Sequence, residues 1–262
     1  MNNREKYLKS QKNYKRLVLF TQIAILFGII FIWELLGRLG VIDTFILSSP
    51  SRMAKTFFEM MHDNLLYNVW VTVKETLIGF SLGVILGVFI ASLLWWSPFV
   101  SRVFEPYLVV LNSLPKIALG PVIIVIAGAS TKAIIFMALA ISLIVTVLEM
   151  LNGFTHTPSD LIKMATTFGA SRAQLYRKIV FPLNIPTLFS SLKINIGLSL
   201  VGVIAGEFLV SRAGLGYLIV YGGHVFKLDL VMTSVVILAV VSALMYEGVV
   251  ILQKAVLRWH EH

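Results

Sequence analysis

The sequence predicts an all-α integral membrane protein with six transmembrane helices and a hairpin of two short, water-exposed helices on the cytoplasmic side. Three observations lead to this fold class. The chain of 262 residues is 58% hydrophobic and 13% charged, and its mean hydropathy of +0.88 is too high for one soluble core. Six apolar segments are long enough to cross a hydrocarbon layer of about 30 Å. A polar, basic segment around 157–182 separates the fourth from the fifth.

The predicted spans each hold about 20 apolar residues, which is the length at which a helix crosses the hydrocarbon layer. They lie near 17–36, 75–96, 103–127, 132–150, 187–210 and 229–252. We therefore expect a basic N-terminal segment over 1–16, a transmembrane domain over 17–252 and a tail over 253–262. Between the first two spans, an amphipathic run over 53–70 predicts a helix that lies on the outer membrane interface.

Small residues recur at every fourth position of the second span. They are Gly79, Gly83, Gly87 and Ala91. A stripe of this kind lets the backbone of another helix approach closely. We expect the stripe to pack within one subunit rather than at an interface between subunits.

The third span is interrupted by the segment 112–121, which contains two prolines and one lysine. Because these residues would leave backbone carbonyls and a charge unpaired in lipid, the segment must line protein or water. It is either a kink packed against neighbouring helices or a broken helix of a translocation pathway. In the second case, Asn112 and Lys116 are candidate pathway residues.

The polar segment after the fourth span begins with the signals of a short helix. Thr157 and Pro158 predict its N-cap and its first turn. Gly169 stands where a left-handed residue commonly ends a helix. One apolar helical face between these ends is formed by Leu161, Ala165 and Phe168.

A second short helix is predicted directly after the first. Ser171 and Gln174 have the spacing of a capping box, in which each side chain satisfies a free backbone N–H of the other residue. Pro182 and Pro186 lack an amide hydrogen and mark the boundary before the fifth span.

Glu207 lies near the outer end of the fifth span, where an ionisable side chain needs a partner or water. It is either a structural carboxylate, bonded to the following loop or to a neighbouring helix, or a candidate residue of the pathway or its gate. The segment 211–224 that follows is rich in glycine and aromatic residues and predicts a short outer helix and a turn.

The distribution of Lys and Arg predicts the orientation in the membrane. These residues are more numerous in 1–16, in the polar segment and in the tail than in the intervening loops. Because cytoplasmic segments carry the excess of positive charge, both termini and the polar segment are expected to face the cytoplasm. The net charge of +9 gathers at the ends of spans, which indicates contact with membrane lipid and not with nucleic acid.

The sequence holds no motif of catalysis or metal binding. Cysteine is absent, which excludes disulfides and thiolate metal sites. There is no G-x-x-x-x-G-K-[ST] phosphate loop and no H-E-x-x-H pair, and the histidines are scattered. We therefore expect neither an enzyme nor a metal site.

The polar segment resembles the cytoplasmic E-A-A-x-x-x-G signature of permease subunits from bacterial ATP-binding cassette (ABC) importers. The matching residues are Ala165, Gly169, Ala170, Ser171, Ile179, Pro182 and Pro186. Lys163 and Met164 stand where the family usually has Glu-Ala, and Phe181 precedes Pro182 where the family often has Leu. These departures keep the helix–turn–helix design.

A longer part of the chain, about 40–255, is similar to one branch of that family, the permeases of sulfonate, taurine, nitrate and thiamine-precursor importers. The similar segments are Leu47–Ser51, Leu114–Ala118, Gly206–Leu209 and Gly214–Tyr217.

The resemblance implies the fold of a type I ABC importer permease, with cytoplasmic coupling helices at about 157–182. It implies three kinds of partner: a second copy of the chain, two ATPase subunits and an extracytoplasmic substrate-binding protein. The protein would be a multi-pass component of the bacterial inner (plasma) membrane. ATP and Mg²⁺ would be bound by the ATPase, and this chain would hold no cofactor. The residues that would couple to the ATPase are Leu161, Ala165, Phe168, Gly169, Ala170, Ser171, Arg172 and Pro182.

The solute that the resemblance implies is small: a sulfonate, nitrate, a thiamine precursor or a related compound. The alternative function is a self-sufficient, ion-coupled secondary carrier that uses Glu207, Glu149 or Lys193. Such carriers often consist of two similar halves, and 1–130 shows no similarity to 131–262.

Overall fold

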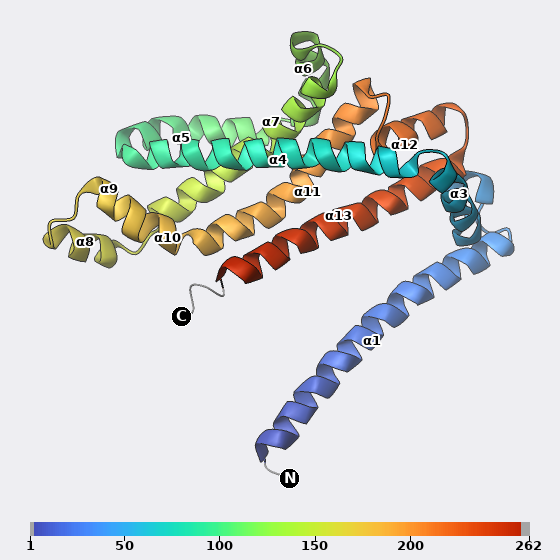
Figure 1. Cartoon of the computed structure of the whole chain (residues 1–262), viewed down its shortest axis with the longest axis horizontal. Coiled ribbons are helices and arrows are strands. Elements are labelled where there is room, and N and C mark those ends of the chain that lie inside the picture. The colour runs from blue at the N-terminus through green and yellow to red at the C-terminus, as the bar shows by residue number, and fades with distance from the viewer. Residues whose placement is uncertain (1–2, 258–262) are drawn as a thin grey trace. The chain divides into compact units, whose positions relative to one another are not determined.

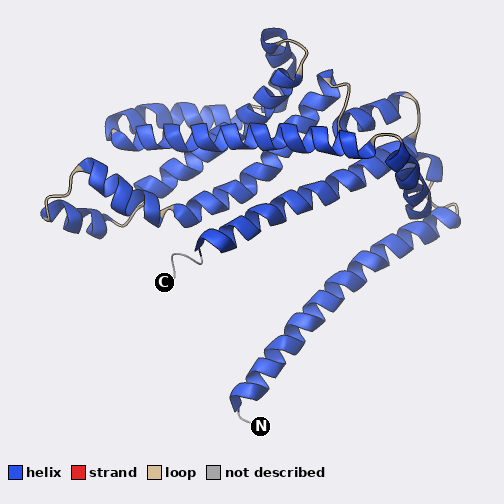
Figure 2. Cartoon of the chain, in the orientation of Figure 1, coloured by secondary structure: helices blue, strands red, loops and turns tan. Residues whose placement is uncertain are grey.

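The computed structural model describes residues 3–257, and the ordered elements of this part of the chain are helices, with no strand (Figures 1 and 2). In chain order they are α1 (Asn3–Arg38), α2 (Thr44–Leu47), α3 (Pro50–His62), α4 (Leu65–Trp96), α5 (Pro98–Ser113), η1 (Lys116–Leu119), α6 (Gly120–Ala127), α7 (Thr131–Thr155), α8 (Ser159–Thr167), α9 (Arg172–Leu175), η2 (Tyr176–Val180), α10 (Phe181–Leu183), α11 (Ile185–Val210), α12 (Leu215–His224) and α13 (Leu228–Leu257). The predicted tail begins inside α13, and its residues 258–262 lie outside the described part.

The chain forms two compact units. The first holds the described residues up to Asp63 together with Gly222–Thr233. The second holds Asn64–Tyr221 together with the described residues from Ser234 onward.

The helices confirm the predicted membrane spans. Five stretches of the described chain are long and apolar enough to cross a membrane, namely Arg16–Arg38, Leu65–Trp96, Thr131–Thr155, Ile185–Val210 and Leu228–Leu257. A sixth span is formed if Pro98–Ser113 and Lys116–Ala127 cross together, and these two pieces are bent by 84°. The interruption predicted in the third span is therefore present.

The predicted interfacial helix over 53–70 is wrong in its extent. Ser49 caps α3, its hydroxyl accepting from the N–H of Arg52 at 3.4 Å, and the helix ends at His62. Asn64 then adopts a left-handed conformation with φ of 63°, which breaks the helical path. The second span begins at Leu65, ten residues before the predicted start, and the last third of the amphipathic run, 65–70, belongs to it.

In the second unit, α7 packs against both α4 and α11 (Figure 1). The glycine stripe of α4 makes the first contact possible, because a Cβ on Gly79 would lie 2.6 Å from the Cβ of Ala138. Gly202 of α11 approaches the same residue, and a Cβ there would lie 2.6 Å from the Ala138 Cα. The stripe thus packs within one subunit, as predicted, and places three helix backbones close together.

We predict that Gly79→Ala destabilises the protein by about 1–3 kcal/mol, because the added methyl group overpacks the contact with α7. The measurement is the thermal unfolding midpoint of the purified protein in detergent. The matched control is Gly248→Ala in α13, where an added Cβ meets nothing within 4 Å. This control should be neutral or slightly stabilising, since alanine favours helix more than glycine does. Equal midpoints for the two variants would contradict the role of the stripe.

Candidate functional site: a helical hairpin and two polar networks

The segment 157–182, which we call the hairpin, folds as two short helical pieces joined by a tight turn. Helix α8 ends at Thr167 and is followed, after Phe168, by a left-handed Gly169 with φ of 78°, and the N–H of Ala170 donates to the carbonyl of Ala165 at 3.0 Å. These contacts satisfy carbonyls that the end of α8 would otherwise leave free. The predicted glycine stop is confirmed.

The predicted cap of α8 by Thr157 is wrong. Pro158 occupies the N-cap position and makes no side-chain cap bond. The Thr157 hydroxyl lies one residue earlier, where it accepts from the Asn184 side-chain amide at 3.1 Å. Thr157 therefore joins the end of α7 to the start of α11 instead of starting α8.

The second piece of the hairpin begins with the predicted capping box. The Ser171 hydroxyl accepts from the Gln174 N–H at 3.3 Å, and the Gln174 side chain accepts from the Ser171 N–H at 2.7 Å. After α9 the chain continues through the π-helical turn η2 into α10. Pro186 lies in the first turn of α11, where a missing N–H costs no helical hydrogen bond. Pro182 lies in α10, which follows η2 without a break.

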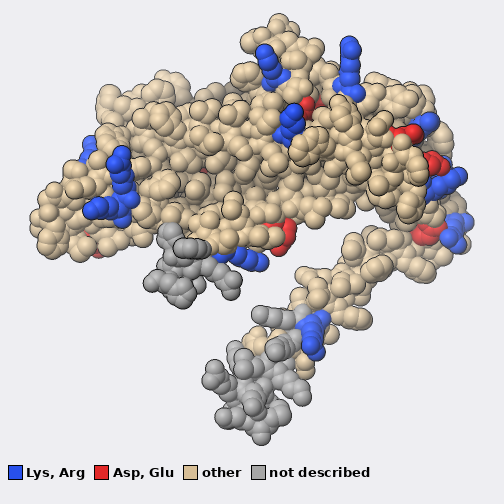
Figure 3. Space-filling view, in the orientation of Figure 1, with Lys and Arg blue, Asp and Glu red and all other residues tan. Residues whose placement is uncertain are grey.

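The hairpin exposes apolar side chains on a segment that is otherwise polar. Leu161 is 37% exposed, Met164 53% and Phe168 85%. Beside them lies a cavity of about 280 Å³ lined by Ala165, Phe168, Gly169, Ala170, Gln174, Leu175, Lys178 and Ile179. Figure 3 shows Lys and Arg side chains gathered over this end of the unit. An apolar patch bordered by positive charge is a feature of a docking surface.

The coupling residues predicted from the resemblance all lie in the hairpin. Seven of them fall on α8, the turn and the first residue of α9, and the eighth, Pro182, lies in α10. Their proposed role stays a prediction, since it concerns a partner chain.

The bend of the third span brings Asn112 and Lys116 together. The Lys116 ammonium group donates to the backbone carbonyl of Asn112 at 2.9 Å and to its side-chain oxygen at 3.2 Å. The positive charge therefore lies on the carbonyl end of α5, where the helix dipole favours a cation. Asn112 is exposed and Lys116 is partly buried.

Glu207 lies in a separate, buried network and is 1% exposed. One carboxylate oxygen accepts from the Thr72 hydroxyl at 2.6 Å, and the other accepts from the Gly216 N–H at 2.6 Å. The Thr72 hydroxyl also accepts from the Leu215 N–H at 2.8 Å. Asn68 completes the network, its side-chain oxygen accepting from the Gly214 N–H at 2.8 Å.

We call Asn68, Thr72 and Glu207 the α12 cap, because together they satisfy the free N–H groups at the start of α12. Glu207 is thus bonded both to the segment that follows α11 and to the neighbouring helix α4. A role of Glu207 in the pathway stays a prediction, and the structure does not bring it together with Asn112 and Lys116.

Sequence reasoning missed Asn68 and Thr72, and it also missed Glu75, which is 4% exposed. One oxygen of the Glu75 carboxyl has no hydrogen-bond partner among the described residues. The signal was the polar spacing of four residues from Asn68 to Thr72 to Thr76. It was overlooked because the second span was expected to begin only at 75.

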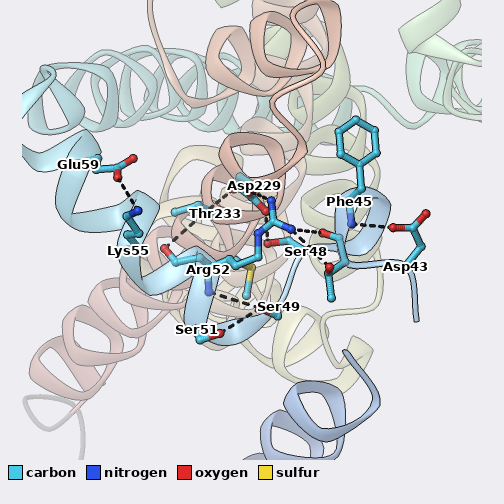
Figure 4. Close-up of polar contacts among 12 residues, drawn as sticks. Asp43, Phe45, Ser48, Ser49, Ser51, Arg52, Lys55, Glu59, Asp229 and Thr233 are labelled. Atoms are coloured by element: carbon cyan, nitrogen blue, oxygen red, sulfur yellow. Dashed lines mark hydrogen bonds and ion pairs between the residues drawn. The ribbon is translucent and has the colours of Figure 1, made fainter. Parts of the chain in front are cut away.

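Another polar network lies in the first unit, around Asp229 in the first turn of α13 (Figure 4). The Arg52 guanidinium lies 2.7 Å from one Asp229 oxygen, and the Ser48 hydroxyl donates to the other at 2.7 Å. Arg52 also donates to the carbonyl of Thr44 at 3.1 Å. The Leu47–Ser51 motif and Arg52 thus fix α2 and α3 to the start of α13.

We predict that Glu207→Gln loosens the start of α12. Glutamine keeps only one acceptor oxygen, so one of the two bonds from Thr72 and Gly216 is lost, at a cost of about 1–3 kcal/mol for a buried group without a partner. Hydrogen–deuterium exchange of the segment 211–224 should become faster by about tenfold or more. Glu59→Gln, which removes only an exposed ion pair to Lys55, should leave it unchanged. Wild-type exchange in Glu207→Gln would contradict the capping role.

Comparison with known proteins places the chain among transport permeases. Residues 83–260 match the family model described as "binding-protein-dependent transport system inner membrane component". A probable ABC transporter permease protein of Haemophilus influenzae is 29% identical over 219 residues, covering 83% of this chain and 89% of the relative. The riboflavin transport system permease protein RibX of Chloroflexus aurantiacus is 27% identical, covering 87% and 85%. The putative aliphatic sulfonates transport permease protein SsuC of Bacillus subtilis is 25% identical, covering 88% and 84%.

The fold of this chain is also similar to that of a solved transporter subunit. A chain of the methionine ABC transporter MetNI in an inward-facing conformation superposes with a TM-score of 0.66 at 21% identity, covering 76% of this chain and 98% of that chain. This similarity confirms the predicted type I importer permease fold, and the matched family model covers more than half of the sequence. The chain therefore belongs to the family of inner-membrane components of binding-protein-dependent transport systems, the permeases of ABC importers.

Proposed function

We propose that two copies of this chain form the translocation pathway of an ABC importer and that each hairpin docks on a separate ATPase subunit in the cytoplasm. An extracytoplasmic binding protein delivers the solute from the other side. The observation that carries the proposal is the exposed apolar face of α8, which ends in Phe168 at 85% exposure.

The hairpin has the properties that a mechanical connection to an ATPase requires. Phe168 projects beside the cavity of the turn, so that it can fill a pocket of a partner as an aromatic anchor. Exposed Arg172, Arg177 and Lys178 follow it and favour a partner surface with acidic groups. No catalytic side chain is needed, because ATP and Mg²⁺ are held by the ATPase.

The proposed orientation places the hairpin and both termini in the cytoplasm. Its support is the excess of Lys and Arg in these segments over the intervening loops. The opposite side then presents the loop between α6 and α7 and the helix α12 to the binding protein.

The proposed solute is a small compound such as a sulfonate, nitrate or a thiamine precursor. Relatives are named for transport of aliphatic sulfonates, riboflavin and formylaminopyrimidine. Within this chain, the exposed Asn112 and the partly buried Lys116 at the bend of the third span offer an amide and a cation to a solute with an anionic or polar group. Glu207 is the third candidate pathway residue.

We predict that Gly169→Trp weakens the binding of the ATPase subunit to the permease by about tenfold or more, as expected for disruption of a hot-spot contact. Gly169 has a positive φ of 78°, so a side chain there strains the turn and also projects into the docking surface. The measurement is the affinity of the purified ATPase for the permease in nanodiscs, together with permease-stimulated ATP hydrolysis.

The matched control is Gly40→Trp, which has a similar φ of 69° and open space around its Cβ but lies in the first unit. It should bind the ATPase like the wild-type protein. Wild-type affinity and hydrolysis in a folded Gly169→Trp variant would count against the proposal. Solute uptake that needs only an ion gradient and this chain alone would favour the secondary carrier.

We predict that cysteines introduced at Asn112 and Lys116 react with a small, water-soluble maleimide in the assembled transporter and that reactivity differs between the nucleotide-free and the ATP-trapped state. The absence of native cysteine makes the background clean. The comparison position is Thr146→Cys, which is fully buried between α4 and α7 and should not react. Protection of both test positions in every state would remove them from the pathway.

A further inference from the structure

One aromatic side chain connects the hairpin to the two transmembrane helices that the glycine stripe holds together. The ring of Tyr176, the first residue of η2, lies 5.3 Å from Trp95 of α4, measured between ring centroids. It lies 5.6 Å from Phe154 of α7. We call the following five residues the aromatic cluster: Tyr176, Trp95, Trp96, Phe154 and Phe181.

The Tyr176 hydroxyl makes a hydrogen bond with the hydroxyl of Ser92 on α4. Ser92 has a single hydroxyl hydrogen, and it donates this hydrogen to the carbonyl of Val88 at 2.6 Å. Tyr176 is therefore the donor and Ser92 the acceptor. This hydrogen bond fixes the orientation of the tyrosine ring against the last turns of α4, in addition to the packing of the rings.

The aromatic cluster rests on a buried base. Phe154 and Val180 are fully buried, and beneath them lie Ala91 of the stripe and Met150 of α7, both also at 0% exposure. The rings meet at tilted or edge-on angles, between 41° and 79° for the contacts of Tyr176, which are favourable for aromatic pairs. Close packing of this kind transmits displacement because it has no space in which to yield.

The charged side of the hairpin also reaches the aromatic cluster. The Arg172 guanidinium carbon lies 6.0 Å from the centre of the Trp95 ring, within the range of a cation–π contact. Tyr176 itself begins a π-helical turn, a rare form that is found frequently at functional sites. The Tyr176 ring thus lies between the part of the hairpin that faces the ATPase and the ends of α4 and α7.

We propose that Tyr176 is the positioning residue through which movement of the hairpin reaches α4 and α7. The proposal rests on the proposed function, because it requires an ATPase that moves the hairpin. A shift of Tyr176 displaces Trp95 and Phe154 together, and the stripe then carries α4 and α7 along as one body. The aromatic cluster is the continuous packed contact between the ATPase-facing surface of the hairpin and the helices α4 and α7.

The test compares two spin-label positions in the transporter assembled from permease and ATPase. Lys163→Cys places a label on the hairpin, and Lys132→Cys places one at the far end of α7, and both positions are exposed. Electron–electron resonance measures the distance between the two copies of each label, without nucleotide and with ATP and vanadate. With Tyr176 present, both distances should change on trapping.

In Tyr176→Ala, the change at position 163 should persist, while the change at position 132 should shrink about twofold or more. Tyr176→Phe, which keeps the ring and loses only the hydrogen bond to Ser92, should have a smaller effect. The matched control is Tyr107→Ala, which removes an exposed tyrosine of α5 and should leave both changes at their wild-type size.

Wild-type changes at both positions in Tyr176→Ala would overturn the proposal, and so would a loss of both, which indicates a structural role only. If Tyr176→Ala does not assemble, Trp95→Leu decides in the same way, because it removes the nearest ring of the aromatic cluster. Failure of the proposed function gives a different result: the distance at position 163 would then stay constant even when Tyr176 is present.

Discussion

The close approach of α4 and α7 determines how the second unit is packed. At Gly79 and Gly87, a methyl group would come within 2.6 Å of the side chain opposite on α7, so that only glycine permits this spacing. In lipid, apolar surface gives helices little reason to associate, and contact between backbones supplies van der Waals attraction instead. The stripe therefore turns two spans into one rigid element.

The two ends of α4 connect this rigid element to two different networks of side chains. At its first turns, Asn68 and Thr72 join Glu207 in capping α12. At its last turns, Ser92, Trp95 and Trp96 hold Tyr176 of the hairpin. One helix thus links a polar network with an aromatic one. An alternating-access transporter needs such a link, because events at the ATPase have to change the opposite side of the membrane.

Sequence reasoning predicted the features that lipid or local chemistry dictates. The spans, the bend at Asn112–Pro121, the glycine stop at Gly169 and the capping box at Ser171 each depend on a few neighbouring residues. The start of the second span was missed because Asn64 turns left-handed without a glycine or proline to signal it. The α12 cap and the aromatic cluster were missed because each joins residues far apart in the chain, 135 positions in the case of Thr72 and Glu207. No local pattern records such pairings.

The proposed function requires that the hairpin contacts a nucleotide-hydrolysing partner on the inner side of the membrane. A photoreactive phenylalanine analogue at position 168 can capture this partner, since Phe168 is 85% exposed at the tip of the hairpin. Irradiation of intact cells followed by mass spectrometry identifies the captured protein, and position 226, a phenylalanine that is 74% exposed elsewhere in the chain, serves as comparison. We expect capture of an ABC ATPase subunit at position 168 and not at position 226. Capture of an extracytoplasmic protein at position 168, or no capture of an ATPase from an assembled transporter, would contradict the proposed function.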